Sequence, residues 1–118
     1  MNLPRPRFAA AAGPLNATTW CLWLAGELDR GSEPRLSVHL AAAARQTDAD
    51  LIIVDLADVT FVDAVALGAL IQAKQVLHHA GKALHLTGAR AKVAELLHLT
   101  GMIDELGVEP NGPPTTHD

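Results

Sequence analysis

The stretch LIIVDLADVTFVDAVALGAL, residues 51–70, decides the fold of this chain. It begins with a continuous apolar run, residues 51–56, which is typical of a strand covered on both faces. Asp63 then precedes a segment rich in alanine and leucine. Because aspartate is a favoured N-cap residue, we predict a helix that begins after Asp63, runs to about His79 and stops at Gly81. The stretch therefore predicts a strand that leads directly into a helix.

The helix predicted after Asp63 has two different faces. One face repeats alanine, leucine or valine at helical spacing, which predicts that it packs on the core. Its positions are 66, 69, 70, 73, 76, 77 and 80. The opposite stripe is polar except at its beginning and is expected to be exposed. It consists of Val65, Gly68, Gln72, Gln75 and His79.

The segments before this stretch predict two strands and a helix. The strands cover residues 8–12 and 18–25, and the turn between them contains Gly13, Pro14 and Asn16. Ser32 is predicted to cap a helix that runs to about residue 46. The apolar stripe of that helix is Leu36, Leu40, Ala43 and Ala44.

The segments after it predict three further elements. Residues 82–88 alternate in character as a strand does, and residues 89–99 form a helix that ends at Gly101. Residues 102–110 are able to supply one short final strand. The inward side chains of the helix are predicted to be Val93, Leu96, Leu97 and Thr100.

Length and composition limit the chain to one globular domain. The 118 residues are 49% hydrophobic and 19% charged, which provides enough apolar material for a single core. We expect one α/β domain over residues 1–110, with a mixed sheet of four to five strands and about three helices. Residues 111–118 are expected to be a disordered tail.

The charges are unevenly distributed along the chain. Between residues 27 and 63, eight acidic residues stand against three arginines, a local net charge of −5. Between residues 64 and 103, four basic residues stand against one glutamate, a local net charge of +3. The overall net charge of −4 does not suit a phosphate polymer, so we expect no direct nucleic-acid binding. Two segments of opposite net charge suit a surface that binds another protein. The alternative is that these charges belong to an ordinary solvated surface.

Few residues are arranged for catalysis or ligand binding. The sequence has no glycine-rich phosphate loop, and the adjacent His78 and His79 diverge on a helix, which is poor geometry for a metal ion. The single cysteine, Cys21, lies in an apolar run and is expected to be buried rather than nucleophilic. We therefore expect no enzyme activity, no cofactor and no metal. A lone cysteine and an interrupted apolar N-terminal span indicate a cytoplasmic protein without membrane insertion.

Three segments resemble the STAS domain of bacterial anti-sigma factor antagonists. They are LAGELD at residues 24–29, the stretch at residues 51–70, and HLTGARAKVAELLHLTG at residues 85–101. Their order and spacing carry the resemblance, which covers about residues 20–108. It implies a β/α domain that binds an anti-sigma factor, itself a serine kinase, and thereby frees a sigma factor. It also implies that the family's C-terminal helix is missing here.

The resemblance also identifies the family's phosphorylation position. In phosphorylatable members the helix opens Asp-Ser-Ser/Thr-Gly, and phosphorylation of the second hydroxyl residue prevents binding. Asp63 matches the aspartate, whereas Ala64, Val65 and Ala66 occupy the other three places. Val65 therefore stands where the phosphate acceptor is expected, and it has no hydroxyl group.

We predict a partner-binding surface formed by residues 26–31 and 63–72. Asp29 matches the aspartate after Gly-Glu-Leu, on the loop that the family uses against its partner. We expect an anti-sigma factor antagonist, monomeric or weakly dimeric, that is not switched at Val65; Thr60 is the other acceptor to consider. The predicted contacts are Glu27, Asp29, Asp63, Ala64, Val65, Gly68 and Gln72.

Two alternatives stay open from the sequence. Val65 is able to pack beneath a neighbouring loop instead of facing a partner. The short domain also resembles the cytoplasmic accessory subunit of bacterial phospholipid ABC transporters, which supports an ATPase. The identity of the partner distinguishes the two functions.

Overall fold

The computed structural model describes residues 8–99. Within them the chain forms β1 (Phe8–Pro14), β2 (Thr19–Leu28), α1 (Glu33–Ala44), β3 (Leu51–Val62), α2 (Ala64–His79), β4 (Ala83–Thr87) and α3 (Ala91–Leu99). The predicted α/β class and the order of these seven elements are confirmed. The strand predicted within residues 102–110, Thr100, the tail at 111–118 and the question of a C-terminal helix lie outside the described residues.

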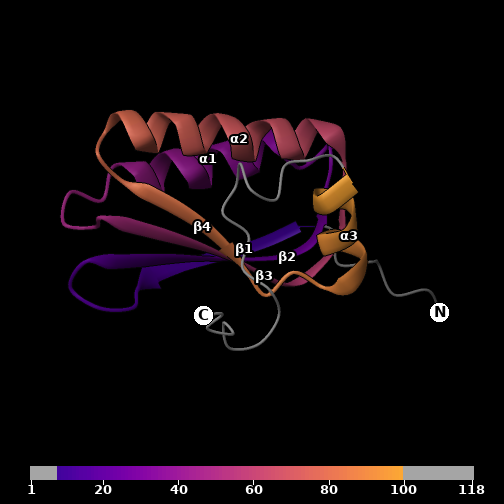
Figure 1. Ribbon diagram of the computed structural model, residues 1–118, viewed down its shortest axis with the longest axis horizontal. Helices are drawn as coiled ribbons and strands as arrows, with labels where there is room; N and C mark the ends of the chain where they lie inside the picture. The colour runs from indigo at the N-terminus through magenta and orange to yellow at the C-terminus, as the bar shows by residue number, and fades with distance from the viewer. Residues whose placement is uncertain (1–7, 100–118) are drawn as a thin grey trace, which may run out of the picture.

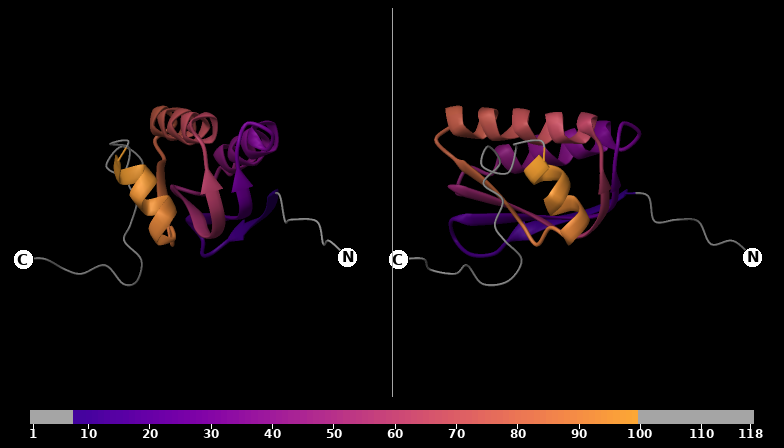
Figure 2. Two further views of the ribbon diagram at one scale, coloured as in Figure 1. Left: turned by 90° about the vertical axis from the view of Figure 1, so that its right-hand side faces the viewer. Right: turned by 45° about the vertical axis from the view of Figure 1, so that its right-hand side comes forward.

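The four strands form one mixed sheet in the order β1-β2-β3-β4. β1 pairs antiparallel with β2, whereas β2, β3 and β4 are mutually parallel. The helices α1 and α2 lie side by side on one face of this sheet (Figure 2). The third helix, α3, contacts β3 and lies near the edge of the sheet that is farther from β1 (Figure 2).

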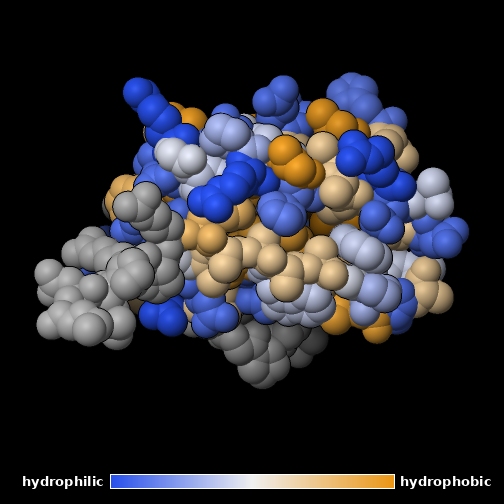
Figure 3. Space-filling model, turned by 180° about the vertical axis from the view of Figure 1, so that it is seen from behind, coloured by the Kyte–Doolittle hydropathy of each residue, from blue (hydrophilic) through white to orange (hydrophobic). Residues whose placement is uncertain are grey.

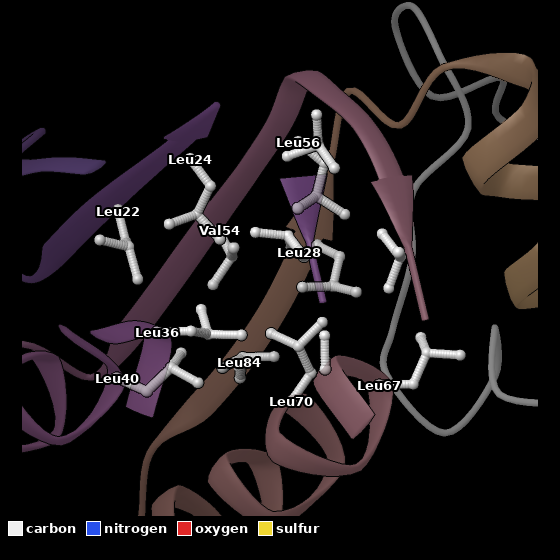
Figure 4. Close-up of a cluster of buried hydrophobic side chains, with 14 of the residues drawn as sticks. Leu22, Leu24, Leu28, Leu36, Leu40, Val54, Leu56, Leu67, Leu70 and Leu84 are labelled. Atoms are coloured by element: carbon white, nitrogen blue, oxygen red, sulfur yellow. The ribbon is translucent and has the colours of Figure 1, made fainter. Parts of the chain in front are cut away.

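The core fills the space between the sheet and the two helices. Leu22, Leu24 and Leu28 of β2 point toward Leu36 of α1 and Leu70 of α2 (Figure 4). All five side chains are at most 2% exposed. Burial of this aliphatic surface is the main force that holds the layers together. The predicted stripe on α1 is confirmed, with Ala44 only partly buried.

The strand β3 is twice as long as the apolar run that predicted it. Its side chains alternate, so that Ile52 and Val54 are fully buried beneath the helices, while Leu51 and Ile53 on the other face are half-buried. The prediction of a strand covered on both faces is therefore confirmed for one face and only in part for the other. The partly covered face tolerates polar residues, and β3 accordingly continues past Asp58 to Val62.

The turn between β1 and β2 lies later than predicted. Gly13 and Pro14 belong to β1 and pair with Cys21 and Trp20. β1 is an edge strand, and an edge strand accepts a proline because no partner needs its missing N–H group. The turn is closed instead by the N–H group of Leu15, which donates to the Thr19 carbonyl oxygen at 2.8 Å.

Figure 3 shows the side of the molecule where β1 and α1 lie, with a band of apolar residues across its middle.

The core face of α2 differs in part from the predicted one. Ala66, Leu70 and Leu77 are buried as expected, but Val76 is 53% exposed and Ala80 is exposed. Leu67, which the predicted face omitted, is 2% exposed. The helix begins after Asp63 and its end precedes Gly81, whose φ of +77° suits glycine, so both predicted boundaries are confirmed.

Two smaller predictions concern α3 and the membrane. On α3, Val93 and Leu97 are buried as predicted, whereas Leu96 is only partly buried. In the part of the chain that the structure describes, no helix is both long enough and apolar enough to cross a bilayer.

Candidate partner-binding surface

The candidate site lies where β2 and β3 end side by side. The last residues that pair between these parallel strands are Leu28 and Val62. The chain leaves β2 through residues 29–32 toward α1, and it leaves β3 through Asp63 directly into α2. The N–H group of Asp63 donates to the Leu28 carbonyl oxygen at 2.9 Å, which holds the two exits together. Both helices therefore begin at the same end of the sheet (Figure 1).

The side chain of Asp63 joins the start of α2 to the loop after β2. Its Oδ1 accepts a hydrogen bond from the N–H group of Ala66 at 3.0 Å, and its Oδ2 accepts one from the N–H group of Arg30 at 2.9 Å. The first bond is the predicted N-cap, which is confirmed. The second bond spans 33 positions in the sequence and was not predicted.

The loop of residues 29–32 is fixed by a reciprocal pair of side chains. Asp29 Oδ1 accepts from the N–H group of Ser32 at 3.0 Å, and Ser32 Oγ accepts from the N–H group of Asp29 at 2.9 Å. The Ser32 hydroxyl also donates to the Glu27 carbonyl oxygen at 2.9 Å, and the residue is 4% exposed. These bonds give the loop one defined shape without help from a ligand.

The predicted role of Ser32 was therefore wrong in its chemistry. Ser32 stands at the N-cap position of α1, but its side chain makes no capping bond. The Asp29 carbonyl oxygen already accepts from the N–H groups of Ser32 and Glu33, at 3.1 and 2.9 Å. Because the chain begins to turn at Asp29, the Ser32 hydroxyl is left to close the loop.

The exposed stripe of α2 begins beside this loop. Val65 is 37% exposed, and Ala64, Gly68 and Gln72 are exposed as well. Val65 thus does not pack beneath a loop, which was the alternative. We call residues 29–31 together with Ala64, Val65, Gly68 and Gln72 the loop–helix surface, with Asp63 at its junction.

Glu27 lies apart from this surface. Residues 26–28 belong to β2 and not to a loop, as the prediction had assumed. Glu27 pairs across the strands with Phe61, on the face of the sheet that α1 and α2 do not cover. Phe61 is 48% exposed and was missed, because the predicted strand ended before it.

Gly68 offers a way to change the surface without disturbing the fold. A β-carbon built on Gly68 meets nothing within 4 Å. Gly68→Ala is therefore expected to stabilise the domain by about 0.5–1 kcal/mol, because alanine loses less backbone entropy in a helix. A urea melt measures the change, and a loss of stability would show that this position is not free. Val65→Ala, on the same stripe, is the control without the glycine effect.

The described residues contain little that could do chemistry. No group of three or more histidine, cysteine or acidic side chains within residues 8–99 could hold a metal ion. Burial raises the pKa of the Cys21 thiol to about 11, and the negative charge of Asp55 adds to the rise. The expected burial of this cysteine is confirmed, and a raised pKa favours the protonated thiol, which is a poor nucleophile. What the loop–helix surface can offer is contact with another molecule.

The sequence matches a family model over most of its length. A family model described as STAS domain covers residues 15–114. The chain belongs to the STAS domain family. No curated protein was found to match it.

Solved structures show the same STAS fold. One is an anti-sigma factor antagonist from Mycobacterium paratuberculosis, with a TM-score of 0.80, 21% identity and 92% of each chain covered. Another is the anti-sigma factor antagonist SpoIIAA in its unphosphorylated form, with a TM-score of 0.71, 18% identity, and 86% of this chain and 89% of that chain covered. A murine Solute Carrier 26 family anion transporter contains a similar part: the TM-score is 0.72 at 15% identity, over 92% of this chain and 21% of the transporter. At these identities the likeness establishes the fold of this STAS domain.

Proposed function

We propose that this STAS domain is an anti-sigma factor antagonist that binds an anti-sigma factor of the serine-kinase type and so frees a sigma factor. Two of the similar structures are described as anti-sigma factor antagonists, which supports this role. The observation that carries the proposal is the Asp63 junction. Two backbone N–H groups, one from the loop and one from α2, share its carboxylate, so that both segments can meet a partner as one rigid surface.

The proposed complex is not switched at residue 65. Val65 is accessible but has no hydroxyl group to accept phosphate. Thr60, the nearest hydroxyl residue before the helix, donates its Oγ1 hydrogen to the Gly26 carbonyl oxygen at 3.3 Å. We propose that the surface stays in its binding state and that its availability is controlled by the amount of protein. We propose that the protein acts by binding and not by catalysis. We also propose that it acts in the cytoplasm, where the free thiol of Cys21 would stay reduced.

The direct test is binding of kinase-type anti-sigma factors from the same genome. Titration calorimetry with each purified factor is expected to find at least one that forms a complex. Prior incubation with ATP and Mg²⁺ should leave the affinity unchanged. The complex should also release the sigma factor from its anti-sigma factor in a competition assay. If no anti-sigma factor binds, or if ATP abolishes binding, the proposal is wrong.

Asp29 provides a test of where the partner binds. Asp29→Asn keeps the side-chain oxygen that accepts from the Ser32 N–H group, but it removes the charge. Stability is expected to change by less than about 0.5 kcal/mol, while the Kd of the complex rises roughly 3- to 10-fold. Asp29→Lys should weaken binding further, although it also loses the loop bond.

The control for this experiment is Asp48→Asn. Asp48 is an exposed carboxylate in the connection between α1 and β3, at the other end of the domain. This variant carries the same change in net charge and should bind as the wild type does. Equal weakening by both variants would indicate a long-range charge effect and would place the contact elsewhere.

A second candidate function is supported by the similarity to a transporter domain. The murine anion transporter contains a domain of this fold as 21% of its chain. This chain could accordingly serve as an accessory subunit of a phospholipid ABC transporter. Affinity capture from solubilised membranes would then recover a transporter ATPase, and the anti-sigma factors would fail to bind in the calorimeter.

A further inference from the structure

The helices α1 and α2 pack against each other on the sheet but do not fill the space between them. Between them lies a hollow of about 230 Å³, lined mainly by small or apolar side chains. We call it the furrow. The two helices run side by side on the sheet (Figure 2). Its walls are formed by Ala41 and Ala44 of α1 and by Ala69, Ala73 and Val76 of α2.

The furrow results from the choice of residues on the facing sides of the helices. Alanine side chains are too short to fill the space between two helices that both rest on a sheet. Val76 was expected in the core, yet it stands at the furrow with half of its side chain exposed. Covering an exposed valine beside an apolar hollow removes apolar area from water, which is favourable for binding.

The furrow is continuous with the loop–helix surface. Gln72 belongs to that surface and also lines the furrow. Ala69 follows Val65 by one helical turn, so the exposed stripe of α2 runs from the Asp63 junction into the hollow. A partner that covers Val65 and Gly68 therefore reaches the furrow without a change of direction.

Size and chemistry decide which kind of occupant fits. Pockets for drug-sized ligands and cofactors usually measure about 300–1,000 Å³, so the furrow is small for a nucleotide. Among the described residues that line it, Ser37 and Gln72 are the polar ones, and none carries a charge to hold a phosphate group. One or two aliphatic or aromatic side chains are of suitable size, and such anchors dominate the energy of protein interfaces.

Charge indicates how the occupant lies. The end of the furrow near the starts of the helices is acidic, with three carboxylates against one arginine. The other end is balanced, with two carboxylates against two basic residues. The groups at the first end are Asp29, Glu33, Asp63 and Arg30, since Arg35 stacks over Phe8 of β1, and those at the other are Asp48, Asp50, Arg45 and Lys82. A partner segment should thus carry basic residues beside the acidic end.

We propose that the furrow receives apolar anchor side chains of the anti-sigma factor, from an amphipathic helix whose basic end lies over the acidic end of the furrow. This inference rests on the proposed function and extends its contact surface along α2 to α1. It assigns a binding role to α1, a helix that the predicted partner-binding surface did not include.

Filling the furrow from within tests the proposal. Ala41→Leu places a larger side chain in the hollow, on an exposed position of α1 that lies outside the loop–helix surface. The Kd for the anti-sigma factor that the wild-type domain binds is expected to rise about tenfold or more. Val38→Leu enlarges an exposed side chain on the same helix outside the furrow, and it should bind as the wild type does. Thermal melts of both variants check that the fold is kept.

Methyl NMR provides the second measurement. The methyl signals of Ala41 and Ala73 are expected to shift when the anti-sigma factor is added, whereas the signals of Val38 stay in place. If Asp29→Asn weakens binding but Ala41→Leu does not, and the two methyl signals do not move, the furrow is empty in the complex and the proposed function still stands. If no anti-sigma factor binds the wild-type domain, both the proposed function and this inference are wrong.

Discussion

The triple variant Ala64→Ser/Val65→Ser/Ala66→Gly is expected to accept phosphate at residue 65 and then to lose its anti-sigma factor. It restores the Asp-Ser-Ser-Gly motif at the start of α2. A phosphoserine would add a charge of about −1.5 to −2 beside the Asp63 carboxylate, in the middle of the loop–helix surface. Repulsion and the cost of burying this charge should weaken binding about 100-fold or more.

The measurement is phosphate incorporation by the kinase-type anti-sigma factor, mapped by mass spectrometry and followed by calorimetry. Ala66 is fully buried, so its replacement by glycine costs about 1–2 kcal/mol of stability. The double variant Ala64→Ser/Ala66→Gly carries the same cost and lacks the acceptor at residue 65. It should bind with or without ATP.

The single variant Val65→Ser tests whether an accessible hydroxyl group at residue 65 is sufficient. Phosphate on this variant would show that it is, and no phosphate would show that the kinase also requires the neighbouring motif residues. The Ala66 side chain is fully buried and does not cover residue 65, so a serine there is open to the solvent. Phosphate on wild-type Thr60 would contradict the claim that the protein is unswitched. Equal affinity of the triple variant with and without phosphate would exclude the start of α2 from the interface.

Loss of the Asp63 carboxylate is expected to destabilise the domain by about 1–3 kcal/mol. In Asp63→Ala, the N–H groups of Ala66 and Arg30 both lose their acceptor. Asp63→Asn has a single acceptor oxygen, so it can serve only one of the two N–H groups. Asp63→Ser can restore the helix cap but cannot also reach the loop.

Denaturant melts should therefore rank wild type above the Asn and Ser variants, and these above Ala. Binding should fall most in the Ala and Ser variants, because the loop of residues 29–32 loses its tie to α2, and less in the Asn variant, whose single oxygen can keep either that tie or the cap. A difference between wild type and Asp63→Ala of less than about 0.3 kcal/mol would mean that the two hydrogen bonds contribute nothing to folding. Asp58→Asn, an exposed carboxylate on β3, is the control for charge alone.

Local signals in the sequence predicted the elements, but not how they join. The cap at Asp63 and the stop at Gly81 were predicted because each acts on the residues next to it. The bond from Arg30 to Asp63 depends on the parallel pairing of β2 and β3, which no local pattern specifies. Ser32 was misassigned for a different reason: its hydroxyl bonds within a turn that begins at Asp29, and the helix pattern does not reveal that turn.

The errors in predicting which residues are buried arose because apolar spacing was read along one helix or strand at a time, without the elements that pack against it. Val76 has the spacing of a core residue, but α1 presents alanine there and leaves it half-covered. Phe61 and the second half of β3 were missed because the apolar run ends at residue 56. The register between β2 and β3 shifts twice in this second half, and such shifts depend on two strands rather than one.

The unequal lengths of β3 and β4 give the two ends of the sheet different freedom. β4 pairs with β3 only as far as Asp55 and Thr87. Beyond that point β3 is bordered on this side by α3, and the Arg90 Nε–H group donates to the Ala57 carbonyl oxygen at 2.8 Å. The first half of β3 is therefore held in a ladder on both edges, and the second half mainly on one. A strand held in this way opens locally at a lower free energy, so hydrogen exchange should be faster in the second half of β3 than in the first, up to Asp63, where the bonds to Arg30 and Ala66 hold the exit from the strand.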